Sequence, residues 1–329
     1  MSISVIVPCF NEAKNIKKNF FKIFNFLKKN FKVFEIILVN DGSTDNTLNV
    51  LKKIHKKLNS KVKICTYKNN IGRGRAIKLG IKAAKNKILV VLDADLSYNP
   101  SVIKKLYDPI HRENYDISIA SAYHKEGTVN NVPFSKLIKS KLINFFFKII
   151  SPIKLSTYTC CVRGYKKTVA ENLNLIEDDK EIHLEVLLKS IYKNYSLIEV
   201  PADLNWSSIK KIEREARDFS KKINSLKPKR NILLNHLIYS FFINPIFFFK
   251  IFFYPLIIIV LYSIVSISLT MSNLLINYGF VESLSLTFKN ASLTFFILGF
   301  AVILLCIVLL FLGIISLQRH LDKEIFLKK

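Results

Sequence analysis

The chain has 329 residues, a formal charge of +26 and 50 % hydrophobic residues, which allows one large α/β domain plus an accessory part. Its five cysteines show no CxxC or Cys/His spacing, which argues against a disulfide scaffold or a zinc module and is typical of a reducing cytosol. No nucleic-acid motif accompanies the charge, so we expect no nucleic acid partner and expect the lysines to meet anionic lipid. An AT-rich genome is an alternative source of the lysines.

Apolar residues that are continuous or that alternate with polar ones predict β-strands at about 3–8, 33–39, 61–67, 87–93 and 115–121. Between them apolar residues recur at helical spacing, first at Ile16, Phe20, Phe24 and Leu27, then at Leu48, Leu51 and Ile54, and then at Ile77, Ile81 and Ala84. Strands that alternate with helices predict an α/β, Rossmann-like domain with a mainly parallel sheet, which we place at residues 1–230. The first residues enter a strand without a signal-peptide pattern, so we expect the amino end to stay in the cytosol.

Polar and small residues follow three of these strands, at 8–12 (PCFNE), 40–45 (NDGSTD) and 93–95 (DAD). Ligands of open parallel sheets bind in the crevice outside the carboxyl ends of the strands. A fourth segment, 72–75 (GRGR), comes directly before a predicted helix. Glycines allow a close backbone approach, and arginines beside a helix N-terminus favour phosphate. The four segments together predict a pocket for a phosphorylated ligand.

Asp93 and Asp95 follow the apolar run at 88–92. In an extended chain residues i and i+2 point the same way, so both carboxylates would face one space. Such oxygen ligands suit Mg²⁺ or Mn²⁺, which would also take the oxygens of a diphosphate and neutralise its charge. A lone D-x-D is weak evidence, and its place after a strand and after three matching segments favours the metal site.

The carboxyl-terminal part, residues 231–329, is predicted to be membranous. Residues 251–271 and 293–317 carry no charge and are long enough to form a two-helix transmembrane hairpin, preceded by a juxtamembrane helix at 231–249. Basic residues precede the first span and follow the second, which places both ends in the cytosol. Residues 135–153 alternate lysines with Leu, Ile and Phe and predict an amphipathic helix at the lipid surface, with a core helix as the alternative.

These segments resemble glycosyltransferase family 2, in the branch that loads sugars onto polyprenyl phosphates, whose catalytic domain has the A-type (GT-A) fold. The resemblance implies that Asp93 and Asp95 hold the metal and act in catalysis together with Arg163. It also implies a nucleotide-sugar pocket formed by Pro8, Asn11, Glu12, Asp41, Gly72, Arg73, Arg75, Asp93, Ala94 and Asp95. For Glu12 a first-turn acid at the helix dipole, and for residues 40–45 a turn that caps the next helix, are the alternatives.

The resemblance is incomplete after residue 130. Residues 156–166 (STYTCCVRGYK) align with D-x-T-x-G-F-R-x-Y, but Thr157 stands where the family usually has Asp, and Cys161 where it has Gly. After residues 198–201 (IEVP) the family's R-x-x-G-x-S-K is missing, and WSSIKK stands there instead. Candidates for the missing basic contacts are Lys210, Lys211 and Arg214.

Asp178 and Asp179 bear on the choice of acceptor, because a hydroxyl acceptor needs a general base and a carboxylate there could supply it. An acid cluster before the helix at 181–192 is the alternative. A lipid monophosphate, whose second pKa is about 6, is already anionic at pH 7 and needs little help.

The sequence therefore predicts a membrane-anchored, metal-dependent inverting transferase that moves a hexose from a UDP- or GDP-sugar to a polyprenyl phosphate at the cytosolic leaflet. The alternatives are a family 2 transferase that acts on a sugar hydroxyl of a lipid-linked or cell-surface glycan, and a donor-binding pseudoenzyme or scaffold. The sequence leaves open whether the chain forms a homo-oligomer or joins a flippase.

Overall fold

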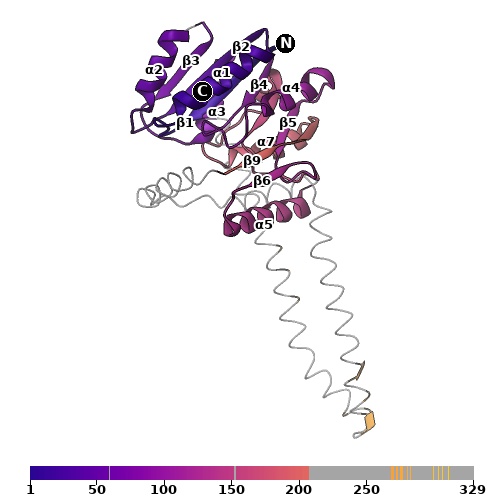
Figure 1. The fold of residues 1–329 in the computed structure, drawn as a ribbon. Coiled ribbons are helices and arrows are strands. Elements are labelled where there is room, and N and C mark those ends of the chain that lie inside the picture. Colours follow the sequence, from indigo (N-terminus) through magenta and orange to yellow (C-terminus); the bar gives the residue numbers. More distant parts are fainter. Residues whose placement is uncertain are drawn as a thin grey trace. The chain divides into compact units, whose positions relative to one another are not determined.

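The computed structural model describes residues 1–58, 60–151 and 153–206, together with isolated positions between 268 and 310. The chain divides into two compact units, Met1–Arg230 and Asn231–Lys329. The helices and strands named below belong to the first unit (Figure 1).

The elements are, in chain order, β1 (Ser2–Cys9), α1 (Ile16–Asn30), β2 (Val33–Asp41), α2 (Thr47–Leu58), β3 (Val62–Tyr67), α3 (Arg73–Ala83), β4 (Ile88–Val91), α4 (Val102–Arg112), β5 (Ile117–Ser121), β6 (Thr128–Asn130), α5 (Phe134–Ile150), β7 (Arg163–Lys166), α6 (Lys167–Asn172), α7 (Ile182–Tyr192), β8 (Leu197–Pro201) and β9 (Asp203–Asn205). Each of the five predicted strands is present, with ends that differ by one to two residues for most of them.

The main sheet has seven strands in the order β3-β2-β1-β4-β7-β5-β8. Only β7 runs antiparallel to its neighbours β4 and β5, and the other pairs in this sheet are parallel. Strands β6 and β9 form a separate parallel pair. The predicted α/β domain with a mainly parallel sheet is thus confirmed.

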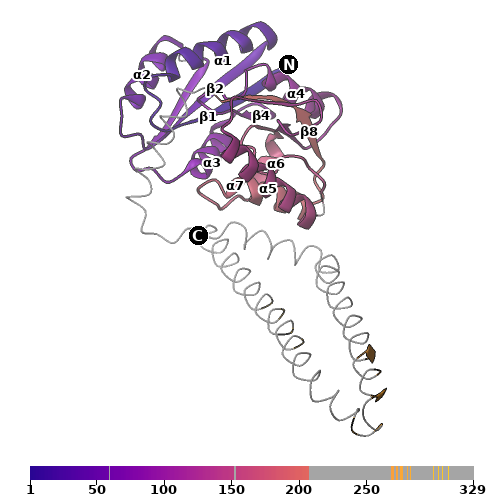
Figure 2. The ribbon, with the colours of Figure 1, turned by 60° about the horizontal axis from the view of Figure 1, so that its bottom comes forward.

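Helices cover both faces of this sheet. Figure 2 shows α1, α2 and α4 on one side and α3, α6 and α7 on the other. In α1 the side chains of Ile16, Phe20, Ile23 and Leu27 are fully buried, at the spacing of three or four residues that defines one face of a helix. Strand β4 is buried along its whole length, as expected for a strand that has helices on both faces.

The acidic pair does not continue β4, which corrects the extended geometry expected at 87–93. The strand ends at Val91, and the chain turns through Ala94 and Asp95. Leu96 adopts a φ of 52°, in the left-handed region that L-residues rarely use. The turn forms because the Asp95 carboxylate accepts hydrogen bonds from the backbone N–H and the hydroxyl of Ser97, at 2.9 and 3.0 Å. Such local bonding competes with strand pairing.

Two predictions on membrane segments have different outcomes. The segment at 135–153 does form a helix, α5. The hairpin at 251–271 and 293–317 and the candidates Lys210, Lys211 and Arg214 lie outside the described residues, apart from isolated positions in the hairpin. In the part of the chain that the structure describes, no helix is both long and apolar enough to cross a membrane.

Candidate active site

The polar segments meet because β1 to β4 are parallel and end at the same edge of the sheet. Pro8 lies beside Val39 in the register of β1 and β2, and Asp41 lies beside Tyr67 in that of β2 and β3. The loops that follow these strands are therefore neighbours, as the crevice rule for open sheets predicts.

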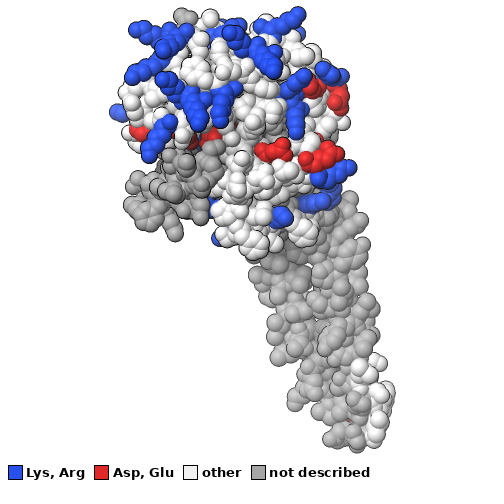
Figure 3. All heavy atoms as spheres, in the orientation of Figure 1, with Lys and Arg blue, Asp and Glu red and all other residues white. Residues whose placement is uncertain are grey.

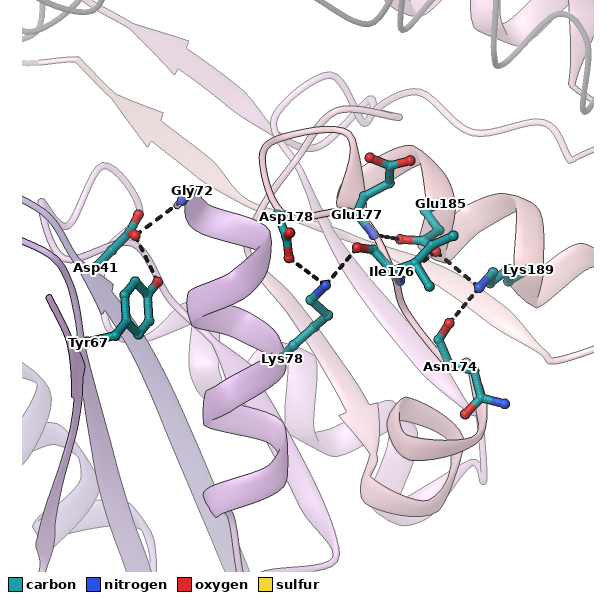
Figure 4. Close-up of polar contacts among 10 residues, drawn as sticks. All are labelled: Asp41, Tyr67, Gly72, Lys78, Asn174, Ile176, Glu177, Asp178, Glu185 and Lys189. Carbon is teal, nitrogen blue, oxygen red and sulfur yellow. Dashed lines mark hydrogen bonds and ion pairs between the residues drawn. The ribbon is translucent and has the colours of Figure 1, made fainter. Parts of the chain in front are cut away.

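Asp41 is buried and organises the turn before α3. Its Oδ1 accepts hydrogen bonds from the Tyr67 hydroxyl at 2.8 Å and from the backbone N–H of Gly72 at 3.2 Å (Figure 4). It also accepts the backbone N–H of Ile71 at 3.0 Å. Burial and the Asp41 carboxylate raise the pKa of Tyr67, so its hydroxyl keeps the proton that it donates. One carboxylate oxygen thus holds the turn between β3 and α3.

Asn11 and Glu12 tie the first two loops together. Asn11 has a φ of 53°, and its Oδ1 accepts the backbone N–H of Thr44 at 2.9 Å. The backbone N–H of Glu12 donates to the Thr47 hydroxyl at 2.8 Å, and the Glu12 side chain is buried. Asp45 accepts the backbone N–H of Thr47 at 2.9 Å, at the start of α2, which agrees with the capping alternative for residues 40–45. The contact of Asp41 with a nucleotide base stays a prediction.

The first turn of α3 packs directly on the backbone of residues 177–179. A Cβ atom on Gly72 would lie 2.4 Å from the carbonyl oxygen of Asp178, and one on Gly74 would lie 2.5 Å from that of Glu177. The backbone N–H of Arg75 donates to the Asp178 carbonyl at 2.9 Å. Gly72 also has a φ of 137°, which excludes other residues. Both glycines are required by this close approach, whether or not a phosphate binds nearby.

The loop at 176–178 is fixed from two sides (Figure 4). The Lys78 ammonium donates to the carbonyl of Ile176 and to the carboxylate of Asp178, both at 2.7 Å. From α7, the Glu185 carboxylate accepts the backbone N–H groups of Ile176 and Glu177 at 2.9 Å. The loop is thereby joined to α3 and to α7.

This arrangement bears on the two acids proposed as a base for a hydroxyl acceptor. Asp178 is half-buried and ion-paired with Lys78, whereas Asp179 is exposed. The Lys78 ammonium thus occupies the Asp178 carboxylate, whereas the Asp179 residue faces solvent. Of the pair, Asp179 is the better placed to act as a base.

The acidic turn after β4 faces the start of α3. Asp95 is buried and bonded to Ser97, and Ala94 is also buried. Asp93 is partly exposed, and its Oδ1 lies 3.5 Å from Nη1 of Arg73, the first residue of α3. The Asp93 carboxylate raises the pKa of Arg73. The structure thus joins the D-x-D turn to the glycine-arginine segment.

A divalent cation fits this turn in its donor chemistry. Carboxylate oxygens are the ligands that Mg²⁺ and Mn²⁺ prefer, and Asp93 already accommodates a cation in the form of the Arg73 guanidinium. Among the described residues no cluster of three or more His, Cys, Asp or Glu side chains could hold a metal ion by itself. A metal held by Asp93 and Asp95 would therefore need further oxygens from its ligand, and a diphosphate supplies them.

Arg163 has a structural position. Its side chain is fully buried, and its outer nitrogens donate to the carbonyls of Tyr158 and His183 at 2.9 and 2.8 Å. It thus joins the segment before β7 to α7. Burial, followed by the charges of Arg163 and Arg73, holds the pKa of His183 well below its usual range. In this structure the outer nitrogens of Arg163 are engaged by backbone carbonyls, and its catalytic role stays a prediction.

The segment in which the sequence departs from the family is also well bonded. The Thr157 hydroxyl lies 2.8 Å from that of Ser121, and the backbone N–H groups of Ser156 and Thr157 donate to the Glu199 carboxylate at 2.8 Å. Cys161 is buried, and burial and the nearby Asp93 raise the pKa of its thiol. Thr157 therefore replaces a charged side chain without leaving a gap in the hydrogen bonding.

Sequence reasoning found the loops but missed the residues that hold them in place. Lys78 and Tyr67 were not predicted, and neither was the role of Glu185 or Glu199. The only sequence signal for Tyr67 is its place at the end of a strand beside Asp41. Lys78 lies one turn after Arg75 on the same helix, which does not reveal its partner 100 residues away.

Comparison with known proteins assigns the chain to a family. The family model described as glycosyl transferase family 2 matches residues 4–173, which is more than half of the chain, and the chain belongs to this family. The match ends at Leu173, directly after α6. It contains every predicted site residue except Asp178, Asp179 and the candidates Lys210, Lys211 and Arg214.

Three similar proteins illustrate the family. The chain is 34 % identical to a dolichol-phosphate mannosyltransferase of Pyrococcus furiosus over 61 % of this chain and 56 % of that protein. It is 26 % identical to a polyprenol monophosphomannose synthase of Mycolicibacterium smegmatis over 60 % and 75 %. A solved structure of glucosyl-3-phosphoglycerate synthase from Mycobacterium tuberculosis with Mn²⁺, UDP and phosphoglyceric acid is 14 % identical, with a TM-score of 0.47 over 68 % and 77 %. The match spans about half the length of the Pyrococcus protein.

Proposed function

We propose that this protein transfers a hexose from a nucleotide-diphosphate sugar to a polyprenyl phosphate. The observation that carries the proposal is the meeting of Asp41, the start of α3 and the D-x-D turn at one sheet edge, with Arg73 in contact with Asp93. The names of the Pyrococcus and Mycolicibacterium relatives support a lipid-phosphate acceptor and mannose as the first sugar to test.

The residues then have separate tasks. Asp41 would hold the nucleotide base with its second carboxylate oxygen, while its first oxygen holds the turn before α3. Arg73 and Arg75 would meet the diphosphate at the start of α3, where the helix dipole also favours an anion. Asp93 and Asp95 would hold Mg²⁺ or Mn²⁺, which when bound neutralises charge on the leaving diphosphate.

The acceptor phosphate needs no strong base, because it is already an anion at pH 7. The pairing of Asp178 with Lys78 favours this acceptor over a hydroxyl, since it engages one of the two candidate bases. Attack of a phosphate oxygen on C1 would form the new glycosidic bond, break the bond from C1 to the donor diphosphate and release the nucleoside diphosphate. An in-line attack inverts the configuration at C1.

A transfer assay tests this proposal. Purified full-length protein in lipid receives labelled GDP-mannose, UDP-glucose or UDP-N-acetylglucosamine with undecaprenyl or dolichyl phosphate and Mg²⁺ or Mn²⁺. A labelled chloroform-soluble product that Asp93→Asn abolishes is expected. Intact donor binding with no lipid product from any pair would overturn the lipid acceptor. Product on a sugar hydroxyl that Asp179→Asn abolishes would instead establish the alternative.

We also propose that α5 lies against the lipid surface from which the acceptor is taken. Large apolar side chains of this helix are exposed, with Phe134 at 75 %, Leu142 at 61 % and Phe145 at 63 % of their surface. Lysines flank them, and the face over α5 is largely uncharged whereas Lys and Arg crowd the surface over α1 and α2 (Figure 3). Apolar side chains between lysines suit an anionic bilayer surface. Two further parts of this proposal stay predictions. They are the transmembrane hairpin at residues 251–271 and 293–317, and the location of the catalytic domain and both termini in the cytosol.

Quenching by brominated lipids tests the position of α5 in the full-length protein. Phe145→Trp adds a fluorophore on α5, and Tyr192→Trp adds one at a position of α7 that is 77 % exposed. Trp206, the single tryptophan of the chain, supplies a common background. Stronger quenching at 145 than at 192 in vesicles with anionic lipid is expected. Equal quenching at the two positions would show that α5 does not touch the bilayer.

A further inference from the structure

Arg73 has an unusual place in the site. It is the first residue of α3, its side chain is 48 % exposed, and its Nη1 lies 3.5 Å from Oδ1 of Asp93, whose side chain is 21 % exposed. The guanidinium therefore sits at the more accessible carboxylate of the D-x-D turn. The other acid, Asp95, has its oxygens bonded to Ser97.

We propose that Arg73 is a stand-in cation for the metal site, and that it couples metal binding to donor binding. This inference rests on the proposed function. Without ligand, the guanidinium neutralises Asp93. When a nucleoside diphosphate binds, its phosphates draw Arg73 away from Asp93, and the carboxylate becomes available to a divalent cation.

Electrostatics gives the reason for the exchange. A divalent cation held by Asp93 would be a close neighbour of the Arg73 guanidinium, whose Nη1 lies 3.5 Å from the Asp93 carboxylate oxygen. Two cations at this separation repel each other. Arg73 can move because its side chain is half-exposed, and the diphosphate offers it an alternative anionic partner in bidentate geometry.

The size of the effect follows from the exposure of the pair. The Arg73 side chain is half-exposed, so solvent screens the pair and the pair contributes about 1 kcal/mol or less. Loss of the Arg73–Asp93 pair is therefore expected to tighten metal binding by about two- to fivefold. Coupling between two ligands is reciprocal. The metal should therefore also tighten diphosphate binding, and by the same factor.

Direct measurement of Mn²⁺ binding tests the inference without any transfer reaction. The full-length protein and its variants are titrated with Mn²⁺ by electron paramagnetic resonance, first alone and then with saturating UDP or GDP. Arg73→Gln removes the stand-in cation, and Arg73→Lys keeps a positive charge there. Lys82→Gln is the matched control, because it removes the same charge from an exposed side chain in the last turn of the same helix.

Without nucleotide, Arg73→Gln should bind Mn²⁺ about two- to fivefold more tightly than the native protein, and Lys82→Gln and Arg73→Lys should change this affinity less. The gain in Mn²⁺ affinity on adding the diphosphate should be smaller in Arg73→Gln. Equal changes of Mn²⁺ affinity in the two glutamine variants would show that only the net charge of the protein matters, and would overturn the inference. Absence of Mn²⁺ binding even with UDP and GDP would overturn both the inference and the metal site of the proposed function.

Discussion

Gly74→Ala tests whether the start of α3 is as tightly packed as the structure shows. In a helix, alanine is more favourable than glycine by about 1 kcal/mol, and by less in the first turn. Helix propensity alone therefore predicts that the substitution stabilises the protein.

The tertiary contacts predict the opposite sign. The new Cβ atom would lie 2.5 Å from the carbonyl oxygen of Glu177 and 2.8 Å from that of Asp179. These are backbone atoms, so a side-chain rotation cannot relieve the overlap, and overpacking of this kind costs about 1–3 kcal/mol. A shift of the loop would also strain the Arg75–Asp178 hydrogen bond, worth about 1 kcal/mol. The free energy of unfolding should fall by about 1–3 kcal/mol.

Urea unfolding of the full-length protein measures this change. Trp206 is the only tryptophan and follows β9 in the first unit, so its fluorescence reports on this unit. Lys82→Ala, at an exposed position of the same helix, is the control and should change the free energy by less than about 0.5 kcal/mol. If Gly74→Ala is as stable as the native protein or more so, the loop at 177–179 yields freely and the packing argument is wrong.

Three further predictions concern single contacts. Lys78→Met should lower the free energy of unfolding by about 1.5–3 kcal/mol, since it removes two charged hydrogen bonds. Asp178→Asn should lower it by about 1 kcal/mol or less, because this carboxylate is half-exposed. Similar losses for the two variants in urea unfolding would contradict a stabilising contact of Lys78 with the Ile176 carbonyl. Tyr67→Phe should weaken UDP or GDP binding by about fivefold in calorimetry, because it removes the 2.8 Å bond that orients Asp41; unchanged affinity would refute that role. Acidification should destabilise the protein through His183, whose pKa in the folded state lies below its value in the unfolded state. Because the unfolded chain binds the proton first, the free energy of unfolding falls as the pH drops below about 6.5, by about 1.4 kcal/mol at pH 5.5. His183→Gln should remove this part of the pH dependence of urea unfolding, and an unchanged pH slope would count against it.

The sequence by itself determined the α/β architecture. Runs such as 3–8 and 33–39 are apolar apart from one residue each, Ser4 and Glu35, which is typical of a strand covered on both faces. The apolar residues of α1 recur at helical spacing. Parallel strands bring their carboxyl ends to one edge, so the meeting of residues 8–12, 40–45 and 93–95 also followed from the order of the elements. These features depend on local periodicity and on chain order, both of which are written in the sequence.

Only the tertiary structure decided the partners within the site. Arg73 and Asp93 are 20 positions apart in the numbering, and Lys78 and Asp178 are 100 apart, so no spacing rule connects them. The sequence marked Arg163 as catalytic by resemblance, whereas the fold buries its guanidinium and bonds it to two carbonyls. Which side chain meets which depends on how loops from distant strands and helices pack. Neither hydrophobic periodicity nor secondary-structure propensity encodes that packing. Many loop conformations agree with both, and long-range contacts select one of them.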